Sequence, residues 1–199
     1  LKGSTITMKN GSIVANTNNV KMIIQNYSNL TLEDMTLDAT DGTNSVVYVM
    51  SNNCGDITIT GDTEIKAKST AGSYAFDAFF WPENSYTDGV TVTIDEDFTG
   101  TITGDIQISE DDSDKTNQEK SSHLVIEAGT IKGDISVTST KGTLSVSDAQ
   151  IVGNIYNTGT GTVEIVGSVV TGNVTGGANS NTTIIDSTVT GTATNIDSI

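Results

Sequence analysis

The chain is 199 residues long, which suits a single domain or one run of repeats. Its nine basic residues are all lysine and stand against 25 acidic residues, and the resulting net charge of −16 argues against binding to nucleic acid or to an anionic membrane. The single cysteine, Cys54, excludes an internal disulfide, and no apolar run approaches the roughly 20 residues that a membrane-spanning helix needs.

Short strands with alternating apolar residues recur from the N-terminus onward. The pattern apolar-Thr-apolar turns every second side chain toward a core, and the branched Cβ of threonine packs well on a pleated sheet. The sequence predicts such strands at residues 6–8, 30–32, 57–59 and 92–94.

The chain between these strands is longer than three short strands require. The excess must therefore leave the core, and polar connections of this kind run over the surface. The sequence predicts exposed loops at residues 38–44, 80–89 and 109–122.

Six of the ten aromatic residues lie between Tyr74 and Tyr86. Alternation would place Tyr74 and Phe76 in the core. Three aromatic residues then follow one another at 79–81, so at least one ring must face outward or cover an edge. Exposed rings are suited to stacking on sugars or anchoring a protein partner, and a core or cap remains the other interpretation. The candidate binding residues are Phe79, Phe80, Trp81 and Tyr86.

Acidic residues cluster in the third of these expected loops. Carboxylates are calcium ligands, but the segment lacks the fixed glycine and the distal glutamate of an EF-hand loop. A solvated acidic loop is therefore the favoured interpretation, with calcium as the alternative and no other cofactor predicted. The candidate calcium ligands are Asp111, Asp112 and Asp114.

Four similar segments make up the last third of the chain. They begin at residues 124, 144, 163 and 182, so the steps between them are 20, 19 and 19 residues. Each ends on apolar-x-Gly-[Asp/Asn/Thr]-apolar, a turn pattern in which we expect glycine to supply a positive φ. The Gly-Asp pair recurs at Gly61-Asp62 and Gly104-Asp105, which predicts equivalent corners there.

Strands of two or three residues cannot bury an apolar face alone. Stacking successive repeats about 4.8 Å apart completes the backbone hydrogen bonds and creates a continuous interior. The sequence therefore predicts about eight stacked turns of three short strands each. Ile126, Val146, Ile165 and Ile184 should line one interior column, and Ile135, Ile155 and Val174 another.

The units GTIKGDI, AQIVGNI and SVVTGNV resemble those of pectin-lyase-like right-handed parallel β-helices, and most closely the adhesin and autotransporter-passenger-like members on bacterial surfaces. The resemblance implies an all-β fold, a single right-handed parallel β-helix (a β-solenoid) over residues 1–199. Its turns would have about 19–20 residues in the C-terminal third and would be longer and loop-bearing before it. The resemblance also implies an extracellular or cell-surface location, within a longer surface protein.

No constellation of residues in the sequence predicts catalysis. Polysaccharide lyases of this fold resemble one another in using Arg or Lys beside calcium-binding acids, whereas this chain has no arginine and scattered lysines. His123 has no second histidine or cysteine nearby to complete a zinc site, and we interpret it as a corner residue. The pair Asp111-Asp112 lies in a segment where neither carboxyl group would be desolvated.

These observations favour a non-enzymatic extracellular surface or adhesion module that presents a lateral face of loops. Carbohydrate binding is the alternative, supported by the aromatic cluster, while a polysaccharide lyase or hydrolase and an ice-binding protein rank below it. The expected partner is a host or cell-surface protein or a polysaccharide, and the domain is expected to be monomeric.

Overall fold

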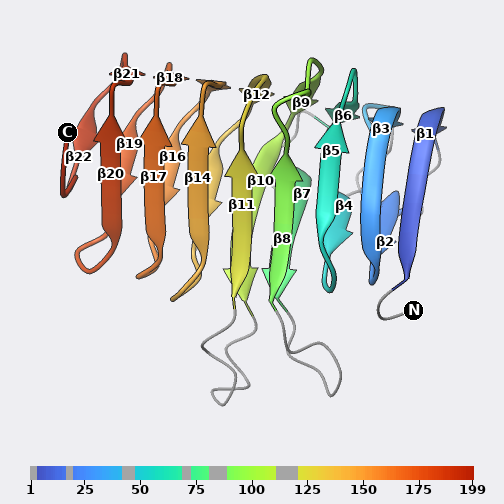
Figure 1. Cartoon of the computed structure of the whole chain (residues 1–199), viewed down its shortest axis with the longest axis horizontal. Coiled ribbons are helices and arrows are strands. Elements are labelled where there is room, and N and C mark those ends of the chain that lie inside the picture. Colours follow the sequence, from blue (N-terminus) through green and yellow to red (C-terminus); the bar gives the residue numbers. More distant parts are fainter. Residues whose placement is uncertain (1–3, 17–19, 42–47, 69–72, 81–88, 111–120) are drawn as a thin grey trace.

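The chain is built from parallel strands. A computed structural model describes residues 4–16, 20–41, 48–68, 73–80, 89–110 and 121–199. Within these ranges there are strands and no helix, and the paired strands run parallel in one sheet of 14 and one of eight strands. The strands follow one another from the N-terminal to the C-terminal end of an elongated molecule (Figure 1). The expected all-β class with parallel sheets is confirmed.

Successive strands visit three rows in turn, so that the strands of one row come from successive repeats of the chain. Row A contains β1 (Thr5–Val14), β3 (Asn29–Asp38), β5 (Ile57–Thr60), β8 (Val90–Ile94), β11 (Ser122–Ile126), β14 (Thr143–Ser147), β17 (Thr162–Val166) and β20 (Asn181–Ile185). Row B contains the C-terminal halves of β1 and β3, then β6 (Glu64–Lys66), β9 (Thr101–Thr103), β12 (Thr130–Lys132), β15 (Gln150–Val152), β18 (Val169–Val170) and β21 (Thr188–Val189). Row C contains β2 (Ile24–Asn26), β4 (Tyr48–Asn52), β7 (Tyr74–Phe80), β10 (Asp105–Glu110), β13 (Ile135–Val137), β16 (Ile155–Asn157), β19 (Val174–Gly176) and β22 (Ala193–Thr194).

The register of the strands confirms the predicted repeats. The predicted starts of the repeats pair with one another throughout row A: Ile6, Leu30, Ile57, Val92, Leu124, Leu144, Val163 and Thr182. Both predicted interior columns are also present as consecutive partners: Ile126, Val146, Ile165 and Ile184, and Ile135, Ile155 and Val174. All seven of these side chains are buried, so the core is a continuous apolar interior between the rows.

The corner between rows A and B depends on a residue with positive φ. Asn10, Asp34 and Asp148 have φ of 53°, 52° and 50°. This left-handed region suits Asn and Asp better than other non-glycine residues, because their short polar side chains form local hydrogen bonds. In two other repeats glycine takes the same position, Gly61 with φ of 63° and Gly167 with φ of 57°.

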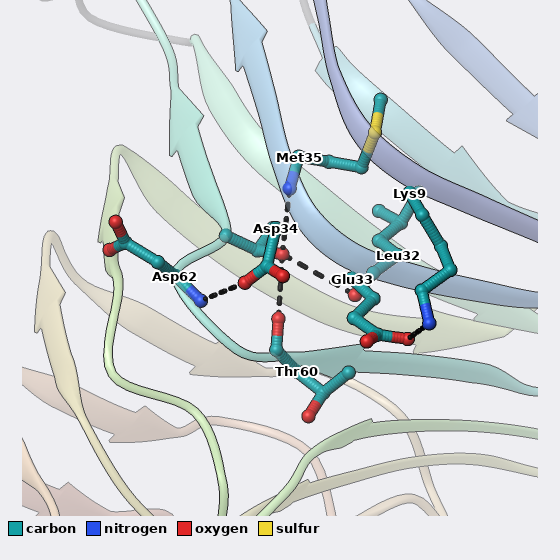
Figure 2. A network of polar contacts seen from close by, with 8 residues as sticks. Lys9, Leu32, Glu33, Asp34, Met35, Thr60 and Asp62 are labelled. Carbon is teal, nitrogen blue, oxygen red and sulfur yellow. Dashed lines mark hydrogen bonds and ion pairs between the residues drawn. The ribbon is translucent and has the colours of Figure 1, made fainter.

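Side chains at this corner also join neighbouring repeats. The Asp62 backbone N–H donates to Asp34 Oδ1 at 2.9 Å (Figure 2). The fully buried Thr63 hydroxyl accepts the Met35 N–H at 3.2 Å and donates to the Thr60 carbonyl oxygen at 2.7 Å. At this corner the chain turns away from the regular hydrogen bonds between strands. Side chains bind the backbone groups that are left without a strand partner, as buried polar groups require.

The corner between rows B and C carries a column of Asp and Asn residues that are joined by hydrogen bonds. The Asn154 backbone N–H and Nδ2 both donate to Asp134 Oδ1, at 2.8 and 2.9 Å. The Asn173 N–H donates to Asn154 Oδ1 at 2.8 Å. The column extends further in both directions, because Asp105 Oδ1 accepts the Asp134 N–H and Asn173 Oδ1 accepts the Thr192 N–H. The alignment of the repeats is therefore confirmed at side-chain level.

The reason for glycine in this corner differs from the expected one. Gly133, Gly153 and Gly172 do not have a positive φ. A Cβ on each would lie 2.2, 2.1 and 2.4 Å from the carbonyl oxygen of the glycine one repeat earlier. The expectation of a positive φ was wrong for these three residues, and close stacking of backbones excludes a side chain instead.

The two earlier Gly-Asp pairs occupy different corners. Gly104-Asp105 lies between β9 and β10, in the column of the later repeats. Gly61-Asp62 lies between β5 and β6, one corner earlier in its repeat. The prediction that both pairs form equivalent corners was therefore wrong, because the Gly-Asp dipeptide suits both kinds of bend.

Strands extend into the edges of the expected loops. Asp38 ends β3, Phe80 ends β7, and Ser109 and Glu110 belong to β10. Ser122, expected as a loop residue, is the first residue of β11. Residues 42–44, 81–88 and 111–120 of the expected loops lie outside the described residues.

Candidate binding site on row C

The outer surface of β4 and β7 is buried, although it faces away from the core. Met50 and Phe76 pair across these strands and fill the interior. Their chain neighbours Ser51 and Asp77 also pair with each other, and alternation directs them outward. Asp77 is nevertheless only 6% exposed and Ser51 only 5%. A carboxyl group is rarely buried to this extent in a surface strand, and buried carboxyl groups gather at functional sites, so this face is a candidate site.

Two stacked tyrosines stand at the start of β4 and β7. Tyr48 begins β4, Tyr74 begins β7, and the two are register partners. Their ring centroids are 5.2 Å apart and their planes differ by 19°. Burial raises the pKa of the Tyr48 hydroxyl, and the nearby Asp77 carboxylate and Tyr74 raise it further. Tyr48 therefore stays protonated at neutral pH and keeps a hydrogen-bond donor.

Asp77 has an environment that favours its neutral form. Burial raises its pKa to about 6, while the Ser51 hydroxyl and the Asn52 amide oppose this shift by favouring the carboxylate. The Asn52 N–H donates to Asp77 Oδ1 at 3.2 Å. The Ser51 hydroxyl lies between this carboxyl group and the Asn53 amide, and it donates to Asn53 Oδ1 at 3.0 Å. Asp77 thus changes its charge close to neutral pH.

Two insertions, residues 81–88 and 111–120, follow directly after β7 and β10. The flanking residues of both insertions lie side by side. Phe80 and Glu110 are register partners, so residues 81–88 and 111–120 leave the strands at adjacent positions. The return positions are also adjacent, because Val90 pairs with Ser122. The residues on either side of the second insertion also contact each other, because Glu110 Oε2 accepts the Ser121 hydroxyl at 2.5 Å. The described residues that flank the two insertions are therefore adjacent, one repeat apart.

The candidate binding residues from the sequence are only partly described. Phe79 is half-buried and follows Asp77 on the outward side of β7, whereas Phe80 points inward and is 3% exposed. Phe80 therefore contributes to packing in the described part of the chain. Trp81 and Tyr86 lie outside the described residues, as do the candidate calcium ligands Asp111, Asp112 and Asp114.

The two groups with the clearest geometry were missed from the sequence. Asp77 sits in the middle of Tyr74–Phe80, an otherwise apolar and aromatic strand, and a lone carboxylate there is a recognisable signal. Tyr48 lies in an apolar run with no such signal, and its stacking on Tyr74 follows only from the register.

His123 is a strand residue, which corrects its expected place at a corner. It is the second residue of β11 and half-buried, and its Nδ1 lies 2.8 Å from the Thr143 hydroxyl. Burial lowers the pKa of His123, and the Asp56 charge opposes that effect. Among the described residues, no group of three or more His, Cys, Asp or Glu side chains is arranged to hold a metal ion. The same part of the chain contains no helix with the length and apolar character to cross a membrane.

The fold and this face define an all-β protein with long parallel sheets and a partly buried, polar and aromatic patch. No family model, no curated protein and no solved structure matches the chain.

Proposed function

We propose that the chain is a right-handed parallel β-helix that acts as a non-enzymatic surface or adhesion module, with its binding face on row C. The cyclic order of the three rows supports a helical path. In Figure 1, β17 runs upward on the near side, β18 crosses at the top, β19 lies behind, and β20 is added toward the C-terminal end. We propose the right-handed sense for this path, because parallel crossover connections nearly always adopt it.

The observation that carries the proposal is the pairing of Phe80 with Glu110 and of Val90 with Ser122. The described residues that flank the two insertions thus lie next to one another on the stack. Segments held in this way commonly carry binding, because a scaffold limits the entropy lost when a partner is bound. A cell-surface location within a longer protein is part of this proposal.

Carbohydrate is the second candidate ligand, and the Tyr48–Tyr74 pair favours it. Sugars are bound by aromatic rings that cover their apolar faces and by polar groups that bond their hydroxyls. Tyr48 and Tyr74 supply two stacked, half-buried rings, and the Asp77 carboxyl group lies close enough to Tyr48 to raise the pKa of its hydroxyl. We place this ligand on the same face as the adhesive function.

Replacing Tyr74 with alanine should weaken binding to the preferred polysaccharide at least about tenfold, because aromatic anchors dominate interface energies. The measurement is affinity electrophoresis of the 199-residue chain against pectin, xylan and glucan, with an assay for released sugar on the same panel. The matched control is Tyr156→Ala, which removes a half-buried tyrosine from β16 of the same row. No binding to any panel member would exclude these polysaccharides as ligands, and sugar release abolished by Asp77→Asn would contradict the non-enzymatic proposal.

A cell-binding assay tests the adhesive function itself. Labelled chain should bind to cultured epithelial cells, and Tyr74→Ala should reduce the bound fraction more than Tyr156→Ala does. Equal binding by both variants would contradict a binding face on row C.

A further inference from the structure

A buried amide oxygen at the corner between rows C and A has no hydrogen-bond partner among the described residues. It belongs to Asn157, which ends β16, is completely buried and pairs with Val137. The Asn157 Nδ2 is well satisfied, because it donates to the carbonyl oxygens of Gly161 and Asn181, at 2.9 and 3.2 Å, and to the Thr182 hydroxyl at 3.2 Å. An unpaired oxygen at this depth is costly, since folding has removed it from solvent water.

A second unpaired group lies at the same corner, one repeat earlier. Ser139 follows β13 by two residues and is only 2% exposed. Its hydroxyl oxygen also lacks a hydrogen-bond partner in the part of the chain that the structure describes. Because Val137 of β13 pairs with Asn157 of β16, the two corners lie directly beside each other in the stack. Buried polar groups are rarely left unpaired, so two of them in adjacent corners indicate a shared partner.

The orientation of the Asn157 amide directs its oxygen toward Ser139. Asn181 and Thr182 belong to the repeat after Asn157, so the amide nitrogen faces the C-terminal end of the stack. The amide oxygen is on the other side of the group and is left for the preceding corner, where Ser139 lies. An amide oxygen can only accept a hydrogen bond, whereas a hydroxyl group can donate and accept. The shared partner must therefore be a donor.

A third polar atom lies close to the Ser139 hydroxyl. A Cβ on Gly142 would lie 1.9 Å from Ser139 Oγ and 2.8 Å from the Ser122 carbonyl oxygen. The Ser139 hydroxyl thus takes up the space of a side chain at Gly142 and lies beside that carbonyl oxygen. The corner offers three oxygens to a small donor, and buried waters in proteins typically make about three hydrogen bonds.

The same corner near the start of the stack shows what the later repeats lack. There Asn26 and Asn52 are register partners, and the Asn26 Nδ2 donates to Asn52 Oδ1 at 2.9 Å. The two corners are thus joined directly by side chains. Asn157 has the apolar Val137 as its partner on the N-terminal side, so no amide is available there to donate to its oxygen.

We propose that the corner between rows C and A binds one internal water molecule, which donates to Asn157 Oδ1 and also bonds the Ser139 hydroxyl. Water fits this position because it is small and can donate to the amide oxygen while it donates to, or accepts from, the hydroxyl group. The Ser122 carbonyl oxygen lies on the same side to accept its other hydrogen. The water replaces the direct contact between Asn26 and Asn52 and joins two successive repeats.

A crystal structure in which ordered water is resolved tests the site directly. We expect one water within about 3 Å of both Asn157 Oδ1 and Ser139 Oγ. A direct hydrogen bond between these two side chains, or a corner that holds no water, would overturn the proposal.

Stability measurements test the bridge independently. Ser139→Ala should raise the equilibrium constant for unfolding about tenfold, because the water loses a partner, whereas removal of a hydroxyl that makes no bond would leave the constant unchanged or lower it. In an Asn157→Ala background the same change should have an effect of about twofold at most, since the water has already lost its acceptor. The lost bonds of Asn157 Nδ2 are common to both members of that pair and cancel. Urea unfolding measures all four constants.

The matched control is Ser136→Ala, in the same strand as Val137. Ser136 is half-buried on the outward side of β13, and its hydroxyl lies 3.5 Å from the Ile106 carbonyl oxygen. Its effect should be the same with and without Asn157→Ala, to within about twofold. An effect of Ser139→Ala that is likewise the same in both backgrounds would show that Ser139 and Asn157 share no water.

Discussion

Replacing Gly153 with alanine should lower the free energy of unfolding by about 3 kcal/mol, the upper range for inserting a methyl group into a tightly packed site. The new Cβ would lie 2.1 Å from the Gly133 carbonyl oxygen, a contact that only a backbone shift can relieve. Gly172 packs on Gly153 in the same way, so the shift would be passed to the next repeat. Urea unfolding followed by circular dichroism measures the loss.

The control for this substitution is Gly11→Ala in β1. A Cβ there would meet the flexible end of the Met35 side chain at 3.4 Å, an ordinary contact. We expect a change within about 0.5 kcal/mol. Equal effects at Gly11 and Gly153 would show that loss of backbone freedom, rather than stacking of repeats, accounts for the consensus glycine.

Replacing Asp77 with asparagine should remove a pH dependence of stability. The pKa of Asp77 rises from 3.8 in the unfolded chain to about 6 in the fold, so the folded state holds the proton more tightly. The protonated group stabilises the fold fully below about pH 4, and this contribution is lost as the pH rises through about 6. A shift of about two units corresponds to about 3 kcal/mol. Asparagine stays neutral and keeps an oxygen to accept the Asn52 N–H.

The free energy of unfolding of the variant, minus that of the natural chain, should therefore increase by about 2 kcal/mol between pH 4 and pH 7, because the rest of the effect falls outside this range. Denaturant unfolding at several pH values measures this difference, and other carboxyl groups cancel in the comparison. Asp41→Asn, which removes a carboxylate from an exposed turn, is the control and should give a nearly constant difference. A constant difference for Asp77→Asn as well would contradict a neutral carboxyl group on this face.

The repeats could be predicted from the sequence because each stacked repeat needs the same inward positions. A residue such as Val146 must be apolar wherever the strand lies in the stack, so the spacing of apolar-x-apolar units gives the register directly. The sequence also contains a pattern that marks the corner between rows A and B, which the sequence analysis did not use. Asn10, Asp34, Gly61, Asp148 and Gly167 each follow an apolar-x-apolar unit by two residues and have positive φ.

The candidate site could not be predicted in the same way, because it depends on contacts between repeats of different length. Tyr48 and Tyr74 are 26 residues apart, and a one-residue error in the length of the intervening chain would separate their rings. The pairing of β7 with β10 contains an irregularity beside Tyr74, which no spacing rule anticipates. The burial of Asp77 likewise results from neighbours that the repeat pattern does not specify.

The most direct test of the stacked arrangement is a distance between spin labels at its two ends. Thr7 and Thr183 belong to the same outward column of row A, seven repeat steps apart. With Cys54 replaced by alanine and cysteine introduced at both threonines, double electron–electron resonance should give a separation of about 34 Å, seven times the inter-strand spacing of about 4.8 Å. A separation below about 20 Å would show that the chain folds back on itself and would contradict the stack of parallel repeats.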